Sequence, residues 1–159
     1  MRELLDVLEK NGNYNVEQLA VMLNRSVEDI ITAIKKLEDD KVIIGYKTLV
    51  DWEKTDRELV TALIEVKVTP QRGEGFDKIA ERISRYPQVK SCYLMSGGFD
   101  LTVIVEGKSM KEVALFVAEK LSILDSVLST STHFVLKKYK DYGMEFAEEE
   151  QDDREVIVL

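Results

Sequence analysis

The stretch NVEQLAVMLNRSVEDIITAIKKLEDDKVIIGY, Asn15–Tyr46, sets the organisation of the first third of the chain. Apolar residues recur at helical spacing in two runs, Val16–Leu23 and Val27–Leu37, and a polar turn separates the runs. Ser26 precedes Asp29 by three residues, a spacing similar to a capping box, which predicts that the second helix begins at this turn. Two short helices joined by such a turn are typical of a helix-turn-helix.

The second of these helices is expected to bury an apolar stripe and to turn its polar residues outward. The stripe consists of Val27, Ile30, Ile31, Ile34 and Leu37. The candidates for phosphate and base contacts are Arg25, Ser26, Thr32, Lys35 and Lys36, with Lys47 in the following segment. That β-rich segment, VIIGYKTLV, suits a wing or linking strand, and Arg2–Lys10 predicts one more helix upstream. The alternative for the lysines is an ordinary solvated helix face.

A different pattern begins near residue 58. Strands are expected at 59–69, where Pro70 and Gly73 close the strand, at 89–96, at 101–106 and from 127 to about 138. Helices are expected at 75–85 and from 109 through 121. The order β-α-β-β-α-β predicts an α+β fold with a ferredoxin-like domain, one antiparallel sheet with both helices on one face.

The strands at 59–69 and 101–106 have apolar residues that we expect on both faces of the sheet. A sheet face without helices would then expose a large apolar patch in a monomer, so we expect a homodimer or higher homo-oligomer assembled through the sheets. A two-fold dimer would present two recognition helices to two half-sites on double-stranded DNA.

The formal charge of -8 is distributed unevenly. Residues 1–50 hold 7 basic and 9 acidic groups, residues 51–144 hold 14 of each, and residues 145–159 hold 1 basic and 7 acidic groups. We therefore expect a winged helix-turn-helix at 1–50, a linker at 51–57, the ferredoxin-like domain at 58–143 and an acidic tail at 144–159. Residues 147–159 of this tail are expected to be mobile at least through Arg154. The net-negative first fifty residues count against strong phosphate binding.

Other residue types exclude several classes of protein. No run reaches the ~18 apolar residues of a membrane span, and acids occupy the place of a signal peptide's apolar core, so we expect a cytoplasmic protein. Cys92 is the single cysteine, expected as a buried apolar residue without a disulfide or metal role. His133 has no second histidine or cysteine to complete a catalytic or metal set, so we expect no enzyme, metal or cofactor.

The turn Gly97–Asp100 is the most informative local motif of the second half. Its glycines leave backbone amides accessible to a carboxylate, and Asp100 is suited to an ammonium group, so the turn fits an amino-acid zwitterion. The predicted effector site comprises Ser96, Gly97, Gly98, Phe99, Asp100, Thr130 and Thr132. We expect Gly98 and Asp100 to govern the ligand response without affecting the fold. The alternative is a hairpin turn whose aspartate caps nearby amides.

Taken together, these segments resemble the Lrp/AsnC family of transcriptional regulators over residues 1 to about 143. The resemblance rests on the helix-turn-helix with its Leu37–Glu38 ending and Gly45–Tyr46, on YLMSGGFDLTVIVEGKSM and on STSTHFVLKKYKDYG. It implies a sequence-specific DNA-binding regulator whose assembly or DNA binding responds to a small molecule, an amino acid, bound around the glycine turn at the contact between dimers.

The chain departs from the family pattern at three places. Lys41 stands where glycine is usual, Ala33 stands where arginine is common, and Glu28–Asp29 would repel phosphate. One alternative is therefore a sensor or interaction protein of the same fold with impaired DNA binding. Another is an enzyme similar to relatives of this plan in tetrapyrrole side-chain decarboxylation, although the His, Tyr and Arg set of those enzymes is not matched by His133 alone.

Overall fold

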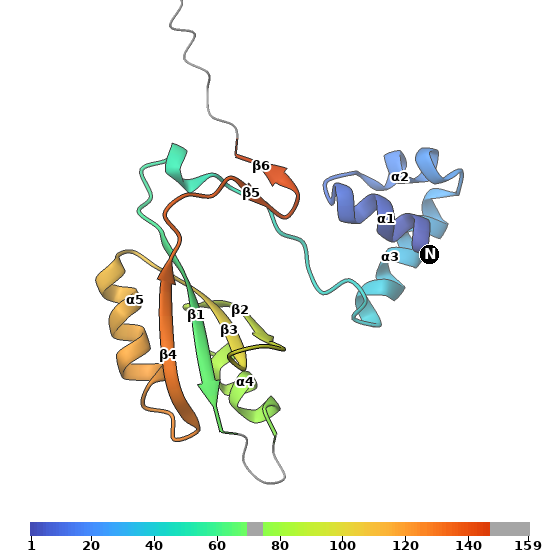
Figure 1. Ribbon diagram of the computed structural model, residues 1–159. Coiled ribbons are helices and arrows are strands. Elements are labelled where there is room, and N and C mark those ends of the chain that lie inside the picture. Colours follow the sequence, from blue (N-terminus) through green and yellow to red (C-terminus); the bar gives the residue numbers. More distant parts are fainter. Residues whose placement is uncertain (70–74, 147–159) are drawn as a thin grey trace, which may run out of the picture. The chain divides into compact units, whose positions relative to one another are not determined.

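The computed structural model describes residues 1–69 and 75–146. The chain divides into two compact units, Met1–Val50 and a second unit from Asp51 onward (Figure 1). The expectations for Pro70, Gly73 and the tail at 147–159 lie outside the described residues. Within the described ranges, no helix has the length and apolar character needed to cross a membrane.

The first unit is built from three helices, α1 (Arg2–Lys10), α2 (Val16–Leu23) and α3 (Val27–Asp39). All three confirm the sequence prediction. Their shared core consists of Leu4, Leu19, Ala20, Ile30 and Leu37. Asn24 ends α2 in the left-handed conformation, with φ of 50°, which turns the chain sharply before α3.

The apolar stripe predicted for α3 is too wide. Ile31 is 49% exposed and Val27 is 37% exposed, whereas Ala33 packs against the core. Successive residues of a helix are rotated by about 100°, so Ile31 lies far from the sector centred on Ile30 that α1 and α2 cover. Placing Val27 and Ile31 in the core was therefore wrong.

The wing or linking strand expected after α3 is also absent from the first unit, whose residues 1–50 are all described. The segment 42–50 has no regular secondary structure, and Ile44 is 91% exposed. Its β-branched residues favour an extended backbone, but a strand also requires a hydrogen-bonding neighbour, which this unit does not supply.

The second unit contains the predicted order of elements. After a short 3-10 helix, Trp52–Lys54, come β1 (Val60–Val68), α4 (Asp77–Ser84), β2 (Val89–Leu94), β3 (Leu101–Gly107), α5 (Met110–Phe116) with a π-helical extension at Val117–Leu121, and β4 (Val127–Phe134). The strand order is β2-β3-β1-β4, and all three pairings are antiparallel. This confirms the α+β ferredoxin-like fold (Figure 1).

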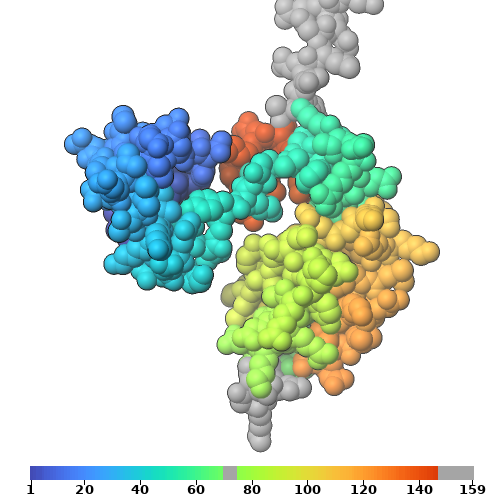
Figure 2. Space-filling model, turned by 180° about the vertical axis from the view of Figure 1, so that it is seen from behind, coloured from blue at the N-terminus to red at the C-terminus, as the bar shows by residue number. Residues whose placement is uncertain are grey.

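Both helices pack on the same face of this sheet, since residues of α4 and α5 share one core with alternate residues of β1. Figure 2, seen from behind, shows α4 in yellow-green beside α5 in gold. The core between the layers contains Ala62, Ile64, Val66 and Val68 from β1, together with Ile83 from α4 and Val113 from α5. Alternate residues of β1 lie on the opposite face: Thr61, Leu63, Glu65 and Lys67. β1 therefore has Leu63 as its one apolar residue on the open face, so the large apolar patch expected there is smaller and more mixed than the sequence predicted.

The chain beyond β4 differs from the predicted strand and tail. β4 ends at Phe134, and a small hairpin follows, with β5 (Lys140–Asp141) paired to β6 (Met144–Glu145). Tyr142 and Gly143 have φ of 45° and 80°, the positive values that a tight two-residue hairpin needs. The start of the predicted acidic tail is thus one strand of a hairpin.

Candidate functional site

The start of α3 depends on the turn before it. The Ser26 hydroxyl oxygen accepts a hydrogen bond from the Asp29 backbone N–H at 3.1 Å, and the Arg25 N–H donates to the Ala20 carbonyl at 3.0 Å. Glu28 and Asp29 occupy the first turn, where negative charge stabilises the positive end of the helix dipole. The two acids therefore have a structural reason to be at this end.

A full capping box lies one helix earlier, where the sequence interpretation missed it. The side chain of Asn15 accepts from the Gln18 N–H at 2.8 Å, and the side chain of Gln18 accepts from the Asn15 N–H at 3.0 Å. The Asn-x-x-Gln spacing at the start of α2 was the signal for it. Both helices of the motif are thus fixed at their first residues.

The predicted DNA contacts are all exposed. Thr32 and Lys35 lie on the side of α3 opposite the buried Ile30, Lys36 flanks them, and Arg25 and Ser26 lie in the preceding turn. The same helix carries four acidic residues and two basic ones. The outward surface of α3 therefore has mixed charge, with acids at both of its ends and the two lysines between them.

Tyr46 connects the segment after α3 to the rest of the first unit. Its hydroxyl donates to Glu38 Oε1 at 3.1 Å, and a Cβ added at Gly12 would meet its ring at 3.3 Å. Partial burial, followed by the hydrogen bond and the negative charge of Glu38, raises the pKa of Tyr46. Lys47 is the next residue and is exposed. From the sequence, Gly45–Tyr46 was assigned to an expected strand and to the family pattern, so this packing role was missed.

The turn at 95–100 joins β2 to β3 with an irregular backbone. Ser96, Gly97 and Gly98 are exposed, Phe99 is half-buried, and a Cβ built at either glycine would meet nothing within 4 Å. The amides and carbonyls around the two glycines are therefore accessible to a ligand.

Asp100 has a structural role in this turn. Its Oδ2 accepts from the Val68 N–H at 2.8 Å, its own N–H donates to the Val66 carbonyl at 3.1 Å, and its carbonyl accepts from the Met95 N–H at 2.8 Å. These bonds fix the turn to the end of β1. The expectation that Asp100 leaves the fold unaffected is therefore wrong, since the carboxylate satisfies the amide of a residue that is only 4% exposed.

Thr130 and Thr132 are separated from the turn within one chain. They pair with Val66 and Ile64 of β1 and so share the helix-facing side of the sheet with them. β1 lies between β4 and β3, which places the threonines two strand spacings, roughly 10 Å, from the start of β3. Thr130 instead lies 3.5 Å from the Ser122 hydroxyl.

The residues weighed for chemistry have ordinary surroundings. His133 Nε2 lies 3.5 Å from Glu65 Oε1 and 3.3 Å from the Ser131 hydroxyl, on the open face of the sheet. Cys92 packs against the core, and burial raises the pKa of its thiol, with a smaller opposing effect of a hydrogen bond from Ser84. Among residues 1–69 and 75–146, no group of three or more His, Cys, Asp or Glu side chains could hold a metal ion.

Comparison with known proteins matches both units. Residues 61–144 match the Lrp/AsnC ligand binding domain. YugG of Bacillus subtilis (strain 168), an uncharacterized HTH-type transcriptional regulator, is 52% identical over 157 residues, which cover 98% of this chain and 94% of YugG. The proline dehydrogenase transcriptional activator of Rhizobium radiobacter is 26% identical over 89% of this chain and 90% of its own length.

Solved structures have the same fold. The transcriptional regulator NMB0573 of Neisseria meningitidis, in complex with L-Met, superposes with a TM-score of 0.70 at 25% identity, covering 87% of this chain and 88% of that one. AsnC of E. coli superposes with a TM-score of 0.65 at 19% identity, covering 86% of this chain and 90% of its own. The resemblance drawn from the sequence is confirmed, and the chain belongs to the Lrp/AsnC family of transcriptional regulators.

Proposed function

We propose that this chain binds specific double-stranded DNA through α3 and changes its DNA binding or assembly when an amino acid binds at the turn Ser96–Asp100. The observation that carries the proposal is the open pair Gly97–Gly98, held in place by Asp100 inside the region that matches a ligand-binding domain. A fixed turn with accessible amides is a preformed receptor for a carboxylate.

The relatives support an amino acid as the effector. NMB0573 was solved as an L-Met complex, and so was the feast or famine regulatory protein Rv3291c of M. tuberculosis. In this chain, the carboxylate of an amino acid would take backbone N–H groups near Gly97 and Gly98. Because Oδ2 of Asp100 accepts from the Val68 N–H, we assign the Oδ1 atom of the same carboxylate to the ammonium group. Thr130 and Thr132 would contribute only from another subunit.

For DNA binding, we assign the positioning role to Lys35 and Lys36 with Arg25, Ser26 and Lys47. The base-reading role goes to Thr32, which projects from the middle of the exposed side of α3. The mixed charge of α3 predicts a smaller electrostatic share of the affinity than a basic recognition helix gives. The protein would then depend on two helices acting together in an oligomer.

Assembly through the open face of the sheet fits this requirement. Leu63 of β1 and Ile104 of β3 are cross-strand partners on that face, and the buried Thr102 lies beside them. A second copy packed on these two apolar residues and their polar surroundings would bury Leu63 and Ile104 and bring two copies of α3 into one assembly. The alternative function is a sensor of the same fold with impaired DNA binding. It would form the same assembly but would not show a DNA affinity that decreases as the salt concentration rises.

The decisive experiment is calorimetric titration of the full chain with a panel of amino acids, comparing wild type with Gly98→Val and Gly45→Val. Both glycines have open space around the position of a Cβ and neither has a positive φ, so both variants should fold. We expect Gly98→Val to weaken binding by at least tenfold and Gly45→Val to leave it unchanged. Equal binding by wild type and Gly98→Val would place the amino-acid site elsewhere.

A further inference from the structure

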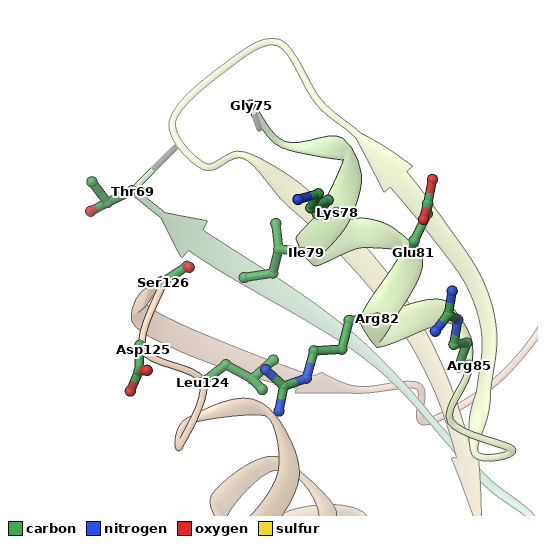
Figure 3. Close-up of a pocket in the computed structure, with 10 residues that line it drawn as sticks. All are labelled: Thr69, Gly75, Lys78, Ile79, Glu81, Arg82, Arg85, Leu124, Asp125 and Ser126. Carbon is green, nitrogen blue, oxygen red and sulfur yellow. The ribbon is translucent and has the colours of Figure 1, made fainter. Parts of the chain in front are cut away.

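Two surface features lie outside the roles proposed above. The first is a groove of about 570 Å³ between α4 and the connection at Leu124–Ser126 in the second unit (Figure 3). Side chains of both charge signs line it, among them Arg82 and Glu81 of α4, so its charges favour no class of ligand. The second is Ile31, an exposed apolar residue of α3 that matches one chemical group of DNA.

Ile31 lies on the outward face of α3. It follows Glu28 by three residues and precedes Lys35 by four, which places the three on one face of the helix. Thr32 lies beside them, and all four are exposed, Ile31 by 49%. The core contact at this level of the helix comes from the neighbouring Ile30, which is fully buried. Ile31 is therefore available for a contact outside the first unit.

The residue types of α3 limit how this face can read base pairs. Bidentate hydrogen bonds to adenine come from asparagine or glutamine, and those to guanine come from arginine or lysine. α3 has the sequence VEDIITAIKKLED, which contains no asparagine, glutamine or arginine. Paired hydrogen bonds to adenine are therefore not available from this helix. Recognition of an A·T pair by this face requires another kind of contact.

An isoleucine suits the methyl group of thymine. Among the four bases of DNA, only thymine presents a methyl group in the major groove. Branching at Cβ holds χ1 of isoleucine in one strongly preferred rotamer on a helix, so the side chain loses little freedom when it makes the contact. Burying the two apolar groups against each other removes both from water, which favours the complex.

We propose that Ile31 is a specificity-determining residue that contacts the 5-methyl group of one thymine in each DNA half-site. The proposal rests on the DNA binding proposed for α3 and adds the base pair that is read. Double-stranded DNA is the partner of this apolar residue because Lys35 and Lys36 follow it on the same helix and supply the positive charge that phosphates require.

Replacement of thymine by uracil tests the contact directly, because it removes the 5-methyl group and leaves every hydrogen-bonding group of the base pair in place. The full chain is first footprinted on the DNA upstream of its own gene, and each protected thymine is then replaced by uracil in turn. We expect uracil at one position in each half-site to weaken wild-type binding by roughly fourfold, the value of one buried methyl group. Uracil at the other positions should leave the affinity nearly unchanged.

Three variants assign the effect to one side chain. Ile31→Ala should fold, because Ile31 lies outside the core, and it should bind the thymine and uracil forms of that position equally. Thr32→Ser loses a methyl group but keeps its hydroxyl, and it should remain sensitive to uracil. Val21→Ala is the matched control and should also remain sensitive, since Val21 is an 83% exposed apolar residue of α2 in a hollow that residues between Tyr14 and Met22 line.

Two results would overturn the inference and leave the proposed function in place. One is a wild-type affinity that no uracil changes, and the other is equal sensitivity to uracil in Ile31→Ala and wild type. A sensitivity that Thr32→Ser loses and Ile31→Ala keeps would assign the methyl contact to Thr32 and would also overturn it. Absence of salt-dependent DNA binding by wild type would overturn both the inference and the proposed function.

Discussion

Two polar turns of this molecule are built in a similar way: Asn24–Ser26 before α3 and Ser96–Asp100 before β3. In each turn the last residue bonds a backbone amide, Ser26 with Asp29 at 3.1 Å and Asp100 with Val68 at 2.8 Å. Arg25 before Ser26 is exposed, and so are Gly97 and Gly98 in the turn that ends at Asp100. The turns differ in burial, because the Ser26 bond is exposed and the Asp100 bond joins elements 32 residues apart in a half-buried place. Asp100, which the sequence suggested as a ligand contact, thus has the larger role in holding the fold together.

The largest loss of stability is expected at Asp100, the more buried of the two turn residues. Asp100→Ala leaves the Val68 amide without its acceptor, so unfolding of the full chain in urea should become easier by about 1–3 kcal/mol. Asp100→Asn keeps an oxygen acceptor and is the matched control, with a smaller loss. Equal stability of wild type and Asp100→Ala would show that the bond contributes nothing and would return Asp100 to a role in ligand binding alone.

The accessible residues next to the first turn are tested by DNA binding. Replacing Lys35 and Lys36 together by alanine should remove two phosphate contacts per subunit, which lowers the slope of log affinity against log salt by about 1.8 for each recognition helix that is bound. The DNA probes are the segment upstream of the protein's own gene and sequence variants of it. Their affinities should all weaken by a similar factor, on the order of tenfold.

Thr32→Ala provides the contrast, because it should change the preference among operator variants and leave the salt slope unchanged. If the double lysine variant and Thr32→Ala both bind a verified operator as wild type does, the recognition face lies elsewhere. If wild type shows no salt-dependent DNA binding, the protein is instead the alternative, a sensor of the same fold with impaired DNA binding.

At the exposed end of the comparison, Ser26→Ala should destabilise the full chain by about 1 kcal/mol, because α3 loses its N-cap. Ser26→Asp retains an acceptor and adds negative charge at the helix start, so it should restore most of the loss. Circular dichroism during urea unfolding measures both. A loss at Ser26 larger than that at Asp100 would contradict the ranking by burial.

The smallest effect concerns Tyr46, whose side chain is more than half exposed. Its folded-state pKa is raised, so its contribution is fully present below the ordinary pKa of 10 and is lost as the pH rises above that value. Tyr46→Phe should therefore lower stability by about 0.5 kcal/mol at pH 8 and by less at alkaline pH. An unfolding series from pH 8 to 11 measures the difference, and a gap that widens with pH would contradict this sign.

Much of the fold could be predicted from local sequence. The three helices of the first unit and the β-α-β-β-α-β order follow from periodicity and from turn residues such as Asn24. The exposure of Ile31 and the irregular backbone at 42–50 could not be predicted, because both depend on which surfaces the neighbouring elements cover. The hairpin at 140–145 depends on Tyr142 adopting a positive φ, which its residue type does not favour.

The candidate functional residues likewise fall into those that the sequence indicated and those that only the tertiary structure revealed. The sequence by itself determined the family, the polar residues Thr32, Lys35 and Lys36 on one side of α3, and the glycines of the turn, because these depend on residue type and spacing along the chain. Only the tertiary structure decided the bond from Val68 to Asp100 and the separation of Thr130 from the turn. Those features join residues far apart in sequence, and no local pattern encodes which distant backbone group a side chain will meet.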